Sequence, residues 1–485
     1  MAAIFLANAP YFLEERYGKL ASIGATLPSL GLLMLGAVLR KAGHRVRIVD
    51  TSAQGLDYDE TIEETKRFRP DIIALTAVTP AIIKTARLAS RIKDIYPSIP
   101  IVIGGPHFTA VPEQTLMDYP VFDYGVVGEG EETVIDLVEA LSAGRIPSDV
   151  PGVAFRQNGN IHFAPPRAPI KDLDALPFPA WDLLDGFPDQ YHPALFKYKR
   201  LPSTHIISAR GCPNQCIFCD TSVFSRRIRF HSPAYVLEMV GYLVRDFNIK
   251  EIIFEDDQFL IKKERVAKIC EGLLRAKWGI SWCCSGRVNS VNDLALLKLM
   301  KRSGCWQISY GIESASQKIL DFAKKAITVD QIDKAVRLTH EAGILSKGYF
   351  MFGLPHETEK TMANTIRFAK RIPLTDISVF MLTPFPGSEM YEIADQHGTM
   401  EKDFEKMNVL DVVYIPKGLS KEKLLHYQRR FMKEFYLRPR IIRNYVGRLI
   451  TNPLNIFSMF KAFFGFLEHI FRFRAQGGVW SGKDL

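Results

Sequence analysis

Three cysteines in the middle of the chain could bind a metal centre. Cys212, Cys216 and Cys219 occur in the stretch RGCPNQCIFCD with the spacing C-x-x-x-C-x-x-C. Thiolates are ligands for zinc and for iron–sulfur clusters. A zinc site needs a fourth ligand, and His205 is poorly placed for it because it lies within an apolar, strand-like run. A [4Fe-4S] cluster held by three thiolates keeps one iron open for a substrate or cofactor, and the spacing favours this cluster over zinc with a distant fourth ligand.

The other four cysteines show no spacing typical of metal ligands. Cys283 and Cys284 are adjacent, so on a strand they point to opposite faces. We expect these two, Cys270 and Cys305 to be buried structural thiols. Seven cysteines, none in the first 211 residues, do not form a disulfide framework, which favours a reducing cytoplasm.

The cysteines directly follow the first of six apolar runs. These runs are STHIISA, EIIFED, SWCCSG, WQISYGIE, KGYFMFG and DISVFML, separated by helical patterns such as 233–246 and 329–342. Parallel strands that alternate with helices predict a partial (β/α)6 TIM-type barrel over residues 201–387, whose reactive groups lie at the C-terminal ends of the strands. A complete eight-unit barrel is the alternative, but two further units are not apparent.

This region resembles the radical S-adenosylmethionine (SAM) superfamily. The resemblance rests on the cysteine spacing, FEDDQF after the second strand, GIES after the fourth, GYFMFGLPHET at the fifth and TPFPGSEMYE at the sixth. It implies that the open iron chelates the amino and carboxylate groups of SAM. It also implies reductive cleavage of SAM to a 5′-deoxyadenosyl radical.

Side chains at consecutive strand ends suit the zwitterionic end of SAM. Asp256 and Asp257 could accept hydrogen bonds from its ammonium, and the planar fork of Arg287 suits its carboxylate. The usual GGE after strand two is replaced by Glu255, Asp256 and Asp257, which leaves open which acid contacts the ammonium. The expected SAM contacts are Phe218, Asp256, Asp257, Arg287, Glu313, Ser314 and Gly353.

Residues 1–145 show a second alternation of strands and helices. The runs AAIFLA, RVRIVD, DIIALTAV, IPIVIGG and FDYGVVG read as buried parallel strands, with helices around 30–42, 58–68, 81–96 and 132–141. This pattern predicts a doubly wound Rossmann-like domain with its ligand at the carboxyl ends of the strands. No G-x-G-x-x-G follows the first strand, which argues against a nicotinamide cofactor.

Three motifs at consecutive strand ends resemble the cobalamin-binding domain that precedes the radical core in one subclass of SAM enzymes. They are PDIIALTAVTP, IVIGGPHFT and VVGEGEET. The alternative is that they are simple turns before helices. No D-x-H-x-x-G motif occurs, so we expect the lower face of cobalamin to lack a histidine ligand. The expected cobalamin contacts are Thr76, Thr79, Gly104, Gly105, His107, Glu129 and Gly130.

Two regions complete the chain. Residues 146–200 read as a proline-rich linker with a short hairpin around 152–163, and 388–485 as a helical, basic and aromatic region. Between 421 and 475 there are twelve lysines and arginines against three acids, a balance equal to the net charge of +9. The apolar face of 454–475 could pack on the barrel or in a dimer, or lie in a membrane interface. Nucleic acid is ranked last because no recognition fold is evident.

Taken together, these features predict an enzyme that cleaves SAM reductively at a [4Fe-4S] cluster. With cobalamin, it methylates an unactivated carbon of a small-molecule, lipid-like, tetrapyrrole or natural-product substrate. A cyclase or rearrangement enzyme is the alternative, as in the anaerobic magnesium-protoporphyrin monomethyl ester cyclase of the same subclass, and a non-catalytic cofactor sensor is a third reading. We expect an electron donor such as flavodoxin or ferredoxin. The expected location is the cytoplasm or the inner face of the membrane, since no secretory signal or spanning segment is evident.

Overall fold

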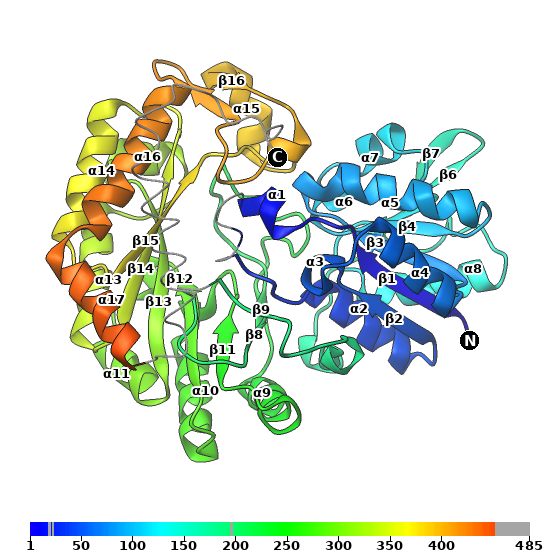
Figure 1. Ribbon diagram of the computed structural model, residues 1–485, viewed down its shortest axis with the longest axis horizontal. Helices are drawn as coiled ribbons and strands as arrows, with labels where there is room; N and C mark the ends of the chain where they lie inside the picture. Colours follow the sequence, from blue (N-terminus) through cyan, green and yellow to red (C-terminus); the bar gives the residue numbers. More distant parts are fainter. Residues whose placement is uncertain (18–20, 22–23, 195–196, 452–485) are drawn as a thin grey trace.

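The computed structural model describes residues 1–17, 21, 24–194 and 197–451. Two α/β units lie side by side, an N-terminal unit and an open barrel that continues into the C-terminal region (Figure 1). This architecture confirms the expected fold class. None of the described helices is long and apolar enough to cross a membrane.

The N-terminal sheet contains the five expected parallel strands and two further strands. The order is β2-β1-β3-β4-β5-β6-β7, with the last two pairings antiparallel. The strands are β1 (Ala3–Asn8), β2 (Arg45–Val49), β3 (Ile72–Thr76), β4 (Ile101–Gly104), β5 (Tyr124–Val126), β6 (Val153–Gln157) and β7 (Asn160–Phe163). The hairpin of β6 and β7, expected within a linker, thus extends this sheet beside β5.

Helices cover both faces of this sheet, which explains why its central strands are apolar throughout. Alternate side chains enter two cores: Ile4 and Leu6 pack with one pair of helices, and Phe5 and Ala7 with the other. The first pair is α2 (Leu30–Lys41) and α8 (Glu131–Ser142); the second is α4 (Tyr58–Phe68) and α5 (Ile82–Ile95). Shorter helices are α1 (Leu13–Tyr17), α3 (Thr51–Gln54), η2 (Thr79–Ala81), α6 (Pro106–Ala110) and α7 (Pro112–Asp118).

The connecting segment after the hairpin is packed against both units. It contains the single turns η3 (Leu173–Ala175) and η4 (Trp181–Leu183). Trp181 is fully buried, and the amide of Ala180 donates to Leu33 O of α2 at 3.1 Å. On the barrel side, the ring of Phe178 meets the ring of Tyr235 edge to face. The segment therefore contributes to the core between the units.

The second sheet has six parallel strands, at the six places where the sequence predicts them. Its order is β15-β14-β13-β12-β11-β8, so it does not close into a complete barrel. The strands are β8 (Ser203–Ile206), β11 (Glu251–Phe254), β12 (Ser281–Gly286), β13 (Cys305–Glu313), β14 (Leu345–Phe352) and β15 (Asp376–Met381). The helices are α9 (Pro233–Phe247), α10 (Lys263–Ala276), α11 (Leu294–Arg302), α12 (Gln317–Phe322), α13 (Val329–Glu341) and α14 (Glu359–Arg371), with the turns η5 (Phe259–Ile261) and η6 (Val288–Ser290).

The C-terminal region follows β15 and includes a small sheet as well as helices. Helix α16 packs against both β15 and α14. The elements are α15 (Glu389–His397), β16 (Gly398–Met400), η7 (Phe404–Lys406), β17 (Tyr414–Pro416), α16 (Lys421–Tyr436) and α17 (Pro439–Thr451). The predicted amphipathic face at 454–475 lies outside the described residues.

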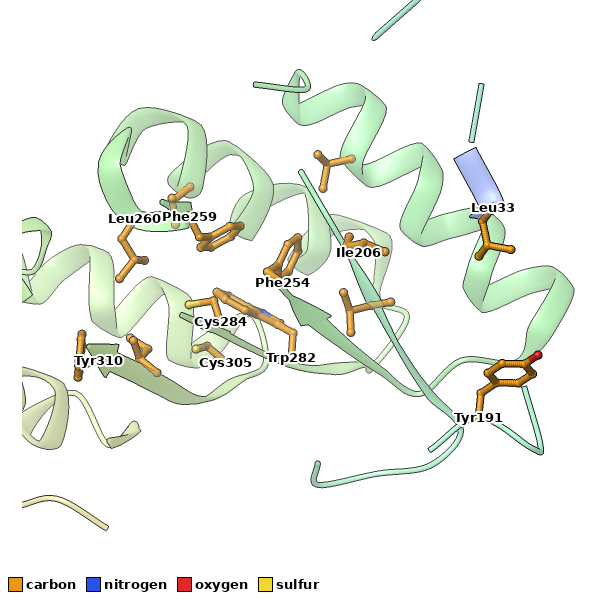
Figure 2. Close-up of a cluster of buried hydrophobic side chains, with 14 of the residues drawn as sticks. Leu33, Tyr191, Ile206, Phe254, Phe259, Leu260, Trp282, Cys284, Cys305 and Tyr310 are labelled. Atoms are coloured by element: carbon orange, nitrogen blue, oxygen red, sulfur yellow. The ribbon is translucent and has the colours of Figure 1, made fainter. Parts of the chain in front are cut away.

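Figure 2 shows the packing on the helix-facing side of the barrel sheet, where Cys284 lies beside Trp282 and Cys305. The neighbouring residue Cys283 belongs to a separate cluster on the inner face with Ile253. Burial raises the pKa of both adjacent thiols well above their ordinary value. These cysteines are therefore protonated packing residues on opposite faces of one strand.

Candidate functional site

The three-cysteine loop lies between two short paired strands, β9 (Ala209–Arg210) and β10 (Arg229–Phe230). Gly211, at φ +90°, precedes the first cysteine, and a Cβ there would lie 2.5 Å from Arg227 O. Only glycine fits this backbone position. The residue after the second cysteine, Ile217, is buried; its amide donates to Ala323 O at 3.1 Å and its carbonyl accepts from Met390 N at 2.7 Å. The loop is thus closely packed at its start and held by backbone hydrogen bonds between its second and third cysteines.

Two of the three sulfurs accept hydrogen bonds from side chains. Cys212 Sγ accepts from Asn214 Nδ2 at 3.3 Å and from Gln258 Nε2 at 3.4 Å. Cys216 Sγ accepts from Arg287 Nη1 at 3.5 Å. Desolvation raises the pKa of the Cys219 thiol to about 12, and the charge of the neighbouring Cys216 is the second contribution. N–H donors directed at sulfur, one of them cationic, suit thiolates that bind iron.

A single metal ion is not indicated at this loop. Within the described ranges, no three His, Cys, Asp or Glu side chains are grouped as ligands for one ion. The three cysteines are free of disulfides. A [4Fe-4S] cluster spreads its thiolates over separate iron atoms, so its ligands need not converge on one point as those of a tetrahedral zinc ion do.

Three of the expected SAM residues meet beside Cys216. Arg287 also donates through Nη2 to Lys325 O. Lys325 Nζ lies 2.6 Å from Glu313 Oε1 and 5.5 Å from the centroid of the Phe218 ring. The Lys325 and Glu313 side chains are each 8% exposed, so their ion pair is largely shielded from solvent. Sequence reasoning did not select Lys325, whose only signal is a paired lysine in FAKKAI soon after GIES.

The three consecutive acids after β11 point in different directions. Glu255 lines a small hollow inside the barrel with Ser285. Asp256 is buried and accepts hydrogen bonds from the amides of Ser208 and Ala209; burial raises the pKa of its carboxyl to about 6. Asp257 is exposed, and it is the acid that contributes to the raised pKa of Cys219. Only Asp257 is therefore both solvent-accessible and close to the cysteines.

The last two expected SAM residues also differ in placement. Ser314 is fully buried, and its hydroxyl accepts from Ser316 N at 3.2 Å and lies 3.4 Å from Thr365 Oγ1. Its hydroxyl is thus engaged within the protein interior. Gly353 has φ +95° and donates through its amide to Glu357 Oε2 at 2.7 Å. Burial raises the pKa of the Glu357 carboxyl to about 8.

A cleft of about 510 Å³ opens at the carboxyl ends of the N-terminal strands. Five of the seven expected cobalamin residues line it: Thr76, Gly104, Gly105, Glu129 and Gly130. A Cβ on Gly105, at φ +94°, would lie 2.4 Å from Thr76 Oγ1, so the backbone approaches this edge closely. Apolar residues of α2 form one wall of the cleft. Across from the strand ends lie the barrel residues Arg210, Phe224, His231 and Tyr235.

Thr79 and His107 are not among the residues that line the cleft. His107 Nδ1 lies 3.3 Å from Thr79 Oγ1, and its ring meets the Phe404 ring edge to face at 5.0 Å. Burial lowers the pKa of His107 to about 4. Because η2 packs on η7, these two residues belong to the contact between the N-terminal unit and the C-terminal region.

A buried network of two acids and two arginines joins the cleft to the cysteine loop. Glu129 binds Arg229 through two hydrogen bonds of 2.6 and 2.8 Å. Glu131 pairs with Arg210 at 2.5 Å. All four side chains are 5–8% exposed. Both acids belong to VVGEGEET, and both arginines flank the cysteines, so this motif holds the strands that carry the loop. Glu129, expected as a ligand contact, has both oxygens engaged with Arg229.

Comparison with known proteins agrees with this arrangement. A B12 binding domain model matches residues 18–138, and a radical SAM superfamily model matches 206–369. An uncharacterized methyltransferase of Pyrococcus horikoshii is 36% identical over 87% of this chain and 90% of its own length. The anaerobic magnesium-protoporphyrin IX monomethyl ester cyclase of Rubrivivax gelatinosus is 32% identical over 86% of this chain and 76% of its own length.

Among solved structures, the methyltransferase TsrM of Kitasatospora setae, with cobalamin and a [4Fe-4S] cluster bound, has a similar fold. The TM-score is 0.69 at 18% identity, covering 91% of this chain and 90% of that one.

Proposed function

The chain belongs to the radical SAM enzymes with a B12-binding domain, the family of methylases and magnesium-protoporphyrin monomethyl ester cyclases, and on this basis we propose that it methylates an unactivated carbon. The observation that carries the proposal is the buried network that fixes a three-cysteine loop beside the cleft of the B12-binding domain. The proposed substrate is a small organic molecule, and assays with candidate compounds determine its class.

Cys212, Cys216 and Cys219 are the proposed ligands of a [4Fe-4S] cluster. A bound cluster would supply the electron that cleaves SAM, and bound cobalamin would supply the methyl group. Asn214, Gln258 and Arg287 direct N–H groups at the first two sulfurs. Such donors stabilise the thiolate form of the cysteines and so disfavour their protonation when the cluster is bound.

For SAM, we propose roles that follow from where the side chains lie. Asp257, exposed near the cysteines, accepts from the ammonium. Arg287, whose buried Nε has no hydrogen-bond partner, orients the carboxylate, while Glu313 is held by Lys325 at the same edge. The backbone at Gly353 remains the proposed adenine contact. Asp256 and Ser314, buried with their polar atoms engaged, position the loops rather than contact SAM.

For cobalamin, the proposed contacts are the residues that line the cleft. Thr76, Gly104, Gly105 and Gly130 present backbone and small side chains to the corrin, which needs close approach along its edge. Glu129, with both oxygens bound to Arg229, has no proposed contact with the ligand and instead holds the strand β10 that follows the cysteine loop. Thr79 and His107 have no proposed contact with the ligand.

We also propose that the protein is cytoplasmic and that a flavodoxin or ferredoxin reduces its cluster. Helix α17 carries the exposed residues Ile442 and Val446 among arginines, which supports a peripheral membrane contact through 421–475. Flotation with anionic liposomes at low salt tests this contact, and a protein that stays entirely in the soluble fraction would exclude it.

The enzyme activity is tested by anaerobic reconstitution with iron, sulfide, cobalamin and SAM, followed by reduction with dithionite. The expected product is 5′-deoxyadenosine, lost in Cys212→Ala and retained in Cys270→Ala, which removes a buried thiol elsewhere in the barrel. Absence of 5′-deoxyadenosine from the unmodified protein would refute the radical SAM activity.

Ring formation is the second candidate, supported by the identity with the Rubrivivax gelatinosus cyclase. The two reactions differ in what they consume. Methylation needs a second SAM to restore the methyl group on cobalt, so S-adenosylhomocysteine should accompany 5′-deoxyadenosine. Ring formation yields 5′-deoxyadenosine alone. Turnover of candidate lipid, tetrapyrrole and other substrates, with both products measured, separates the two.

A further inference from the structure

We propose that Arg210 is a positioning residue shared by the two cofactor sites, with one guanidinium nitrogen held by Glu131 and the other free to donate to an acceptor oxygen of the molecule in the cleft. The inference rests on the proposed function, because it takes that molecule to be cobalamin. Arg210 precedes Cys212 by two residues and lines the cleft.

The guanidinium is held in place on one side. Nη2 pairs with Glu131 Oε1 at 2.5 Å, and the group lies 5.1 Å from the centroid of the Phe224 ring. Phe224 also lines the cleft. The Arg210 side chain is 6% exposed, so its position in the wall is determined by packing and by the ion pair rather than by solvent.

The other terminal nitrogen lacks a hydrogen-bond partner. Arg210 Nη1 is buried with none, and the nearest carboxylate oxygen recorded for it, Glu129 Oε1, is 3.7 Å away. That oxygen is already bound to Arg229 at 2.6 Å. A buried N–H without an acceptor is costly, so an acceptor supplied by the ligand is the natural partner. Amide carbonyl and phosphate oxygens have this chemistry, and cobalamin carries both.

The same residue is tied to the cluster loop by its backbone. Arg210 pairs with Arg229 across β9 and β10, and the preceding amide, of Ala209, donates to Asp256. At Gly211, the next residue, the backbone packs so closely that an added Cβ would lie 2.5 Å from Arg227 O. A ligand that fixes the Arg210 side chain therefore restrains Cys212, and by linkage an ordered cluster loop favours ligand binding.

The test compares Arg210→Lys with Arg229→Lys. Both variants keep a cation in the same buried network, but only residue 210 lines the cleft. Cluster-loaded, full-length protein is titrated with hydroxocobalamin. We expect Arg210→Lys to weaken the Kd about tenfold or more, because a charged hydrogen bond is lost, and Arg229→Lys to change it less than threefold. Equal effects of the two variants, or no effect of Arg210→Lys, would overturn the proposal.

Two further measurements separate this role from a structural one. The electron paramagnetic resonance spectrum of the reduced cluster should change on adding cobalamin to the unmodified protein and to Arg229→Lys but not to Arg210→Lys; the same change in all three refutes the coupling. Cobinamide, which lacks the nucleotide phosphate, identifies the acceptor. If Arg210→Lys weakens cobinamide binding too, the acceptor is a corrin amide; if only cobalamin binding weakens, it is in the nucleotide.

A double variant that neutralises both Arg210 and Glu131 avoids leaving a buried charge that could prevent folding. Arg210→Met combined with Glu131→Gln leaves no unpaired ion and should also weaken cobalamin binding about tenfold. Unchanged binding by this double variant would refute the proposal. If the unmodified protein binds no cobalamin, the cobalamin half of the proposed function fails as well; if all proteins bind it equally, only the role of Arg210 fails.

Discussion

The glycine before Cys212 offers a direct test of how the cysteine loop is held. Gly211 has φ +90°, and an added Cβ would lie 2.5 Å from Arg227 O and 3.0 Å from Ser225 O, whereas ordinary contacts begin at 3.4 Å. Both neighbours are backbone atoms, so they cannot rotate away. In Gly211→Ala either Cys212 or the 225–227 backbone must therefore move by 0.9 Å, the difference between 3.4 and 2.5 Å.

Two terms contribute to the cost of Gly211→Ala. The left-handed backbone conformation disfavours alanine by about 1–2 kcal/mol. Overpacking against the carbonyls adds about 1–3 kcal/mol. Gly159→Ala is the matched control, because Gly159 has φ +80° with nothing within 4 Å of the added Cβ. The control isolates the backbone term in a turn of the hairpin between β6 and β7.

Iron content and far-ultraviolet circular dichroism together test whether the substitution displaces Cys212 without unfolding the protein. We expect Gly159→Ala to bind iron like the unmodified protein. Gly211→Ala should hold less than half as much iron per chain after the same reconstitution, because Cys212 is displaced. Its far-ultraviolet circular dichroism should remain unchanged, which shows that both sheets still form. Equal iron content in the two variants would refute the steric argument.

Two further perturbations test the site beside the cysteines. Lys325→Met leaves the buried carboxylate of Glu313 without its cation and should destabilise the protein by about 3–5 kcal/mol, measured by denaturant unfolding. Combining Lys325→Met with Glu313→Gln should recover most of this stability. A double variant no more stable than the single one would contradict the ion pair. Burial raises the pKa of the Glu357 carboxyl from its ordinary value of 4.5 to about 8. The protonated carboxyl therefore contributes fully to the free energy of unfolding below pH 4.5, and this contribution is lost as the pH rises toward about 8. Glu357→Gln should therefore gain stability relative to the unmodified protein between pH 6 and 8, and parallel melting curves across that range would show that the carboxyl is not shielded from solvent.

Local sequence patterns predicted the regular elements well, because buried parallel strands must be apolar on both faces. The runs AAIFLA and DIIALTAV became β1 and β3, with alternate residues packed into two cores. The expected hairpin also formed, but its sheet could not be predicted. A hairpin of alternating residues carries no signal for the strand it will join, and here β6 pairs with β5.

The sequence predicted the residues at the candidate site but not the direction in which each side chain points. Consecutive acids after a strand predict a polar strand end but not which way each points, and the structure separates Glu255, Asp256 and Asp257. The same holds for Glu129. A glutamate at a strand end can face a ligand or a distant arginine, and its partner Arg229 is 100 residues away in sequence. No local pattern encodes a pairing at that separation.

The sequence by itself therefore determined the chemistry available to this protein. The spacing of Cys212, Cys216 and Cys219 sets the number of thiolates, and the periodicity of apolar runs sets the two parallel sheets that bring strand ends together. Only the tertiary structure decided how those ends interact. Contacts between units depend on side chains far apart in sequence, such as Glu131 with Arg210 and His107 with Phe404, and these pairs exist only once both units have folded against each other.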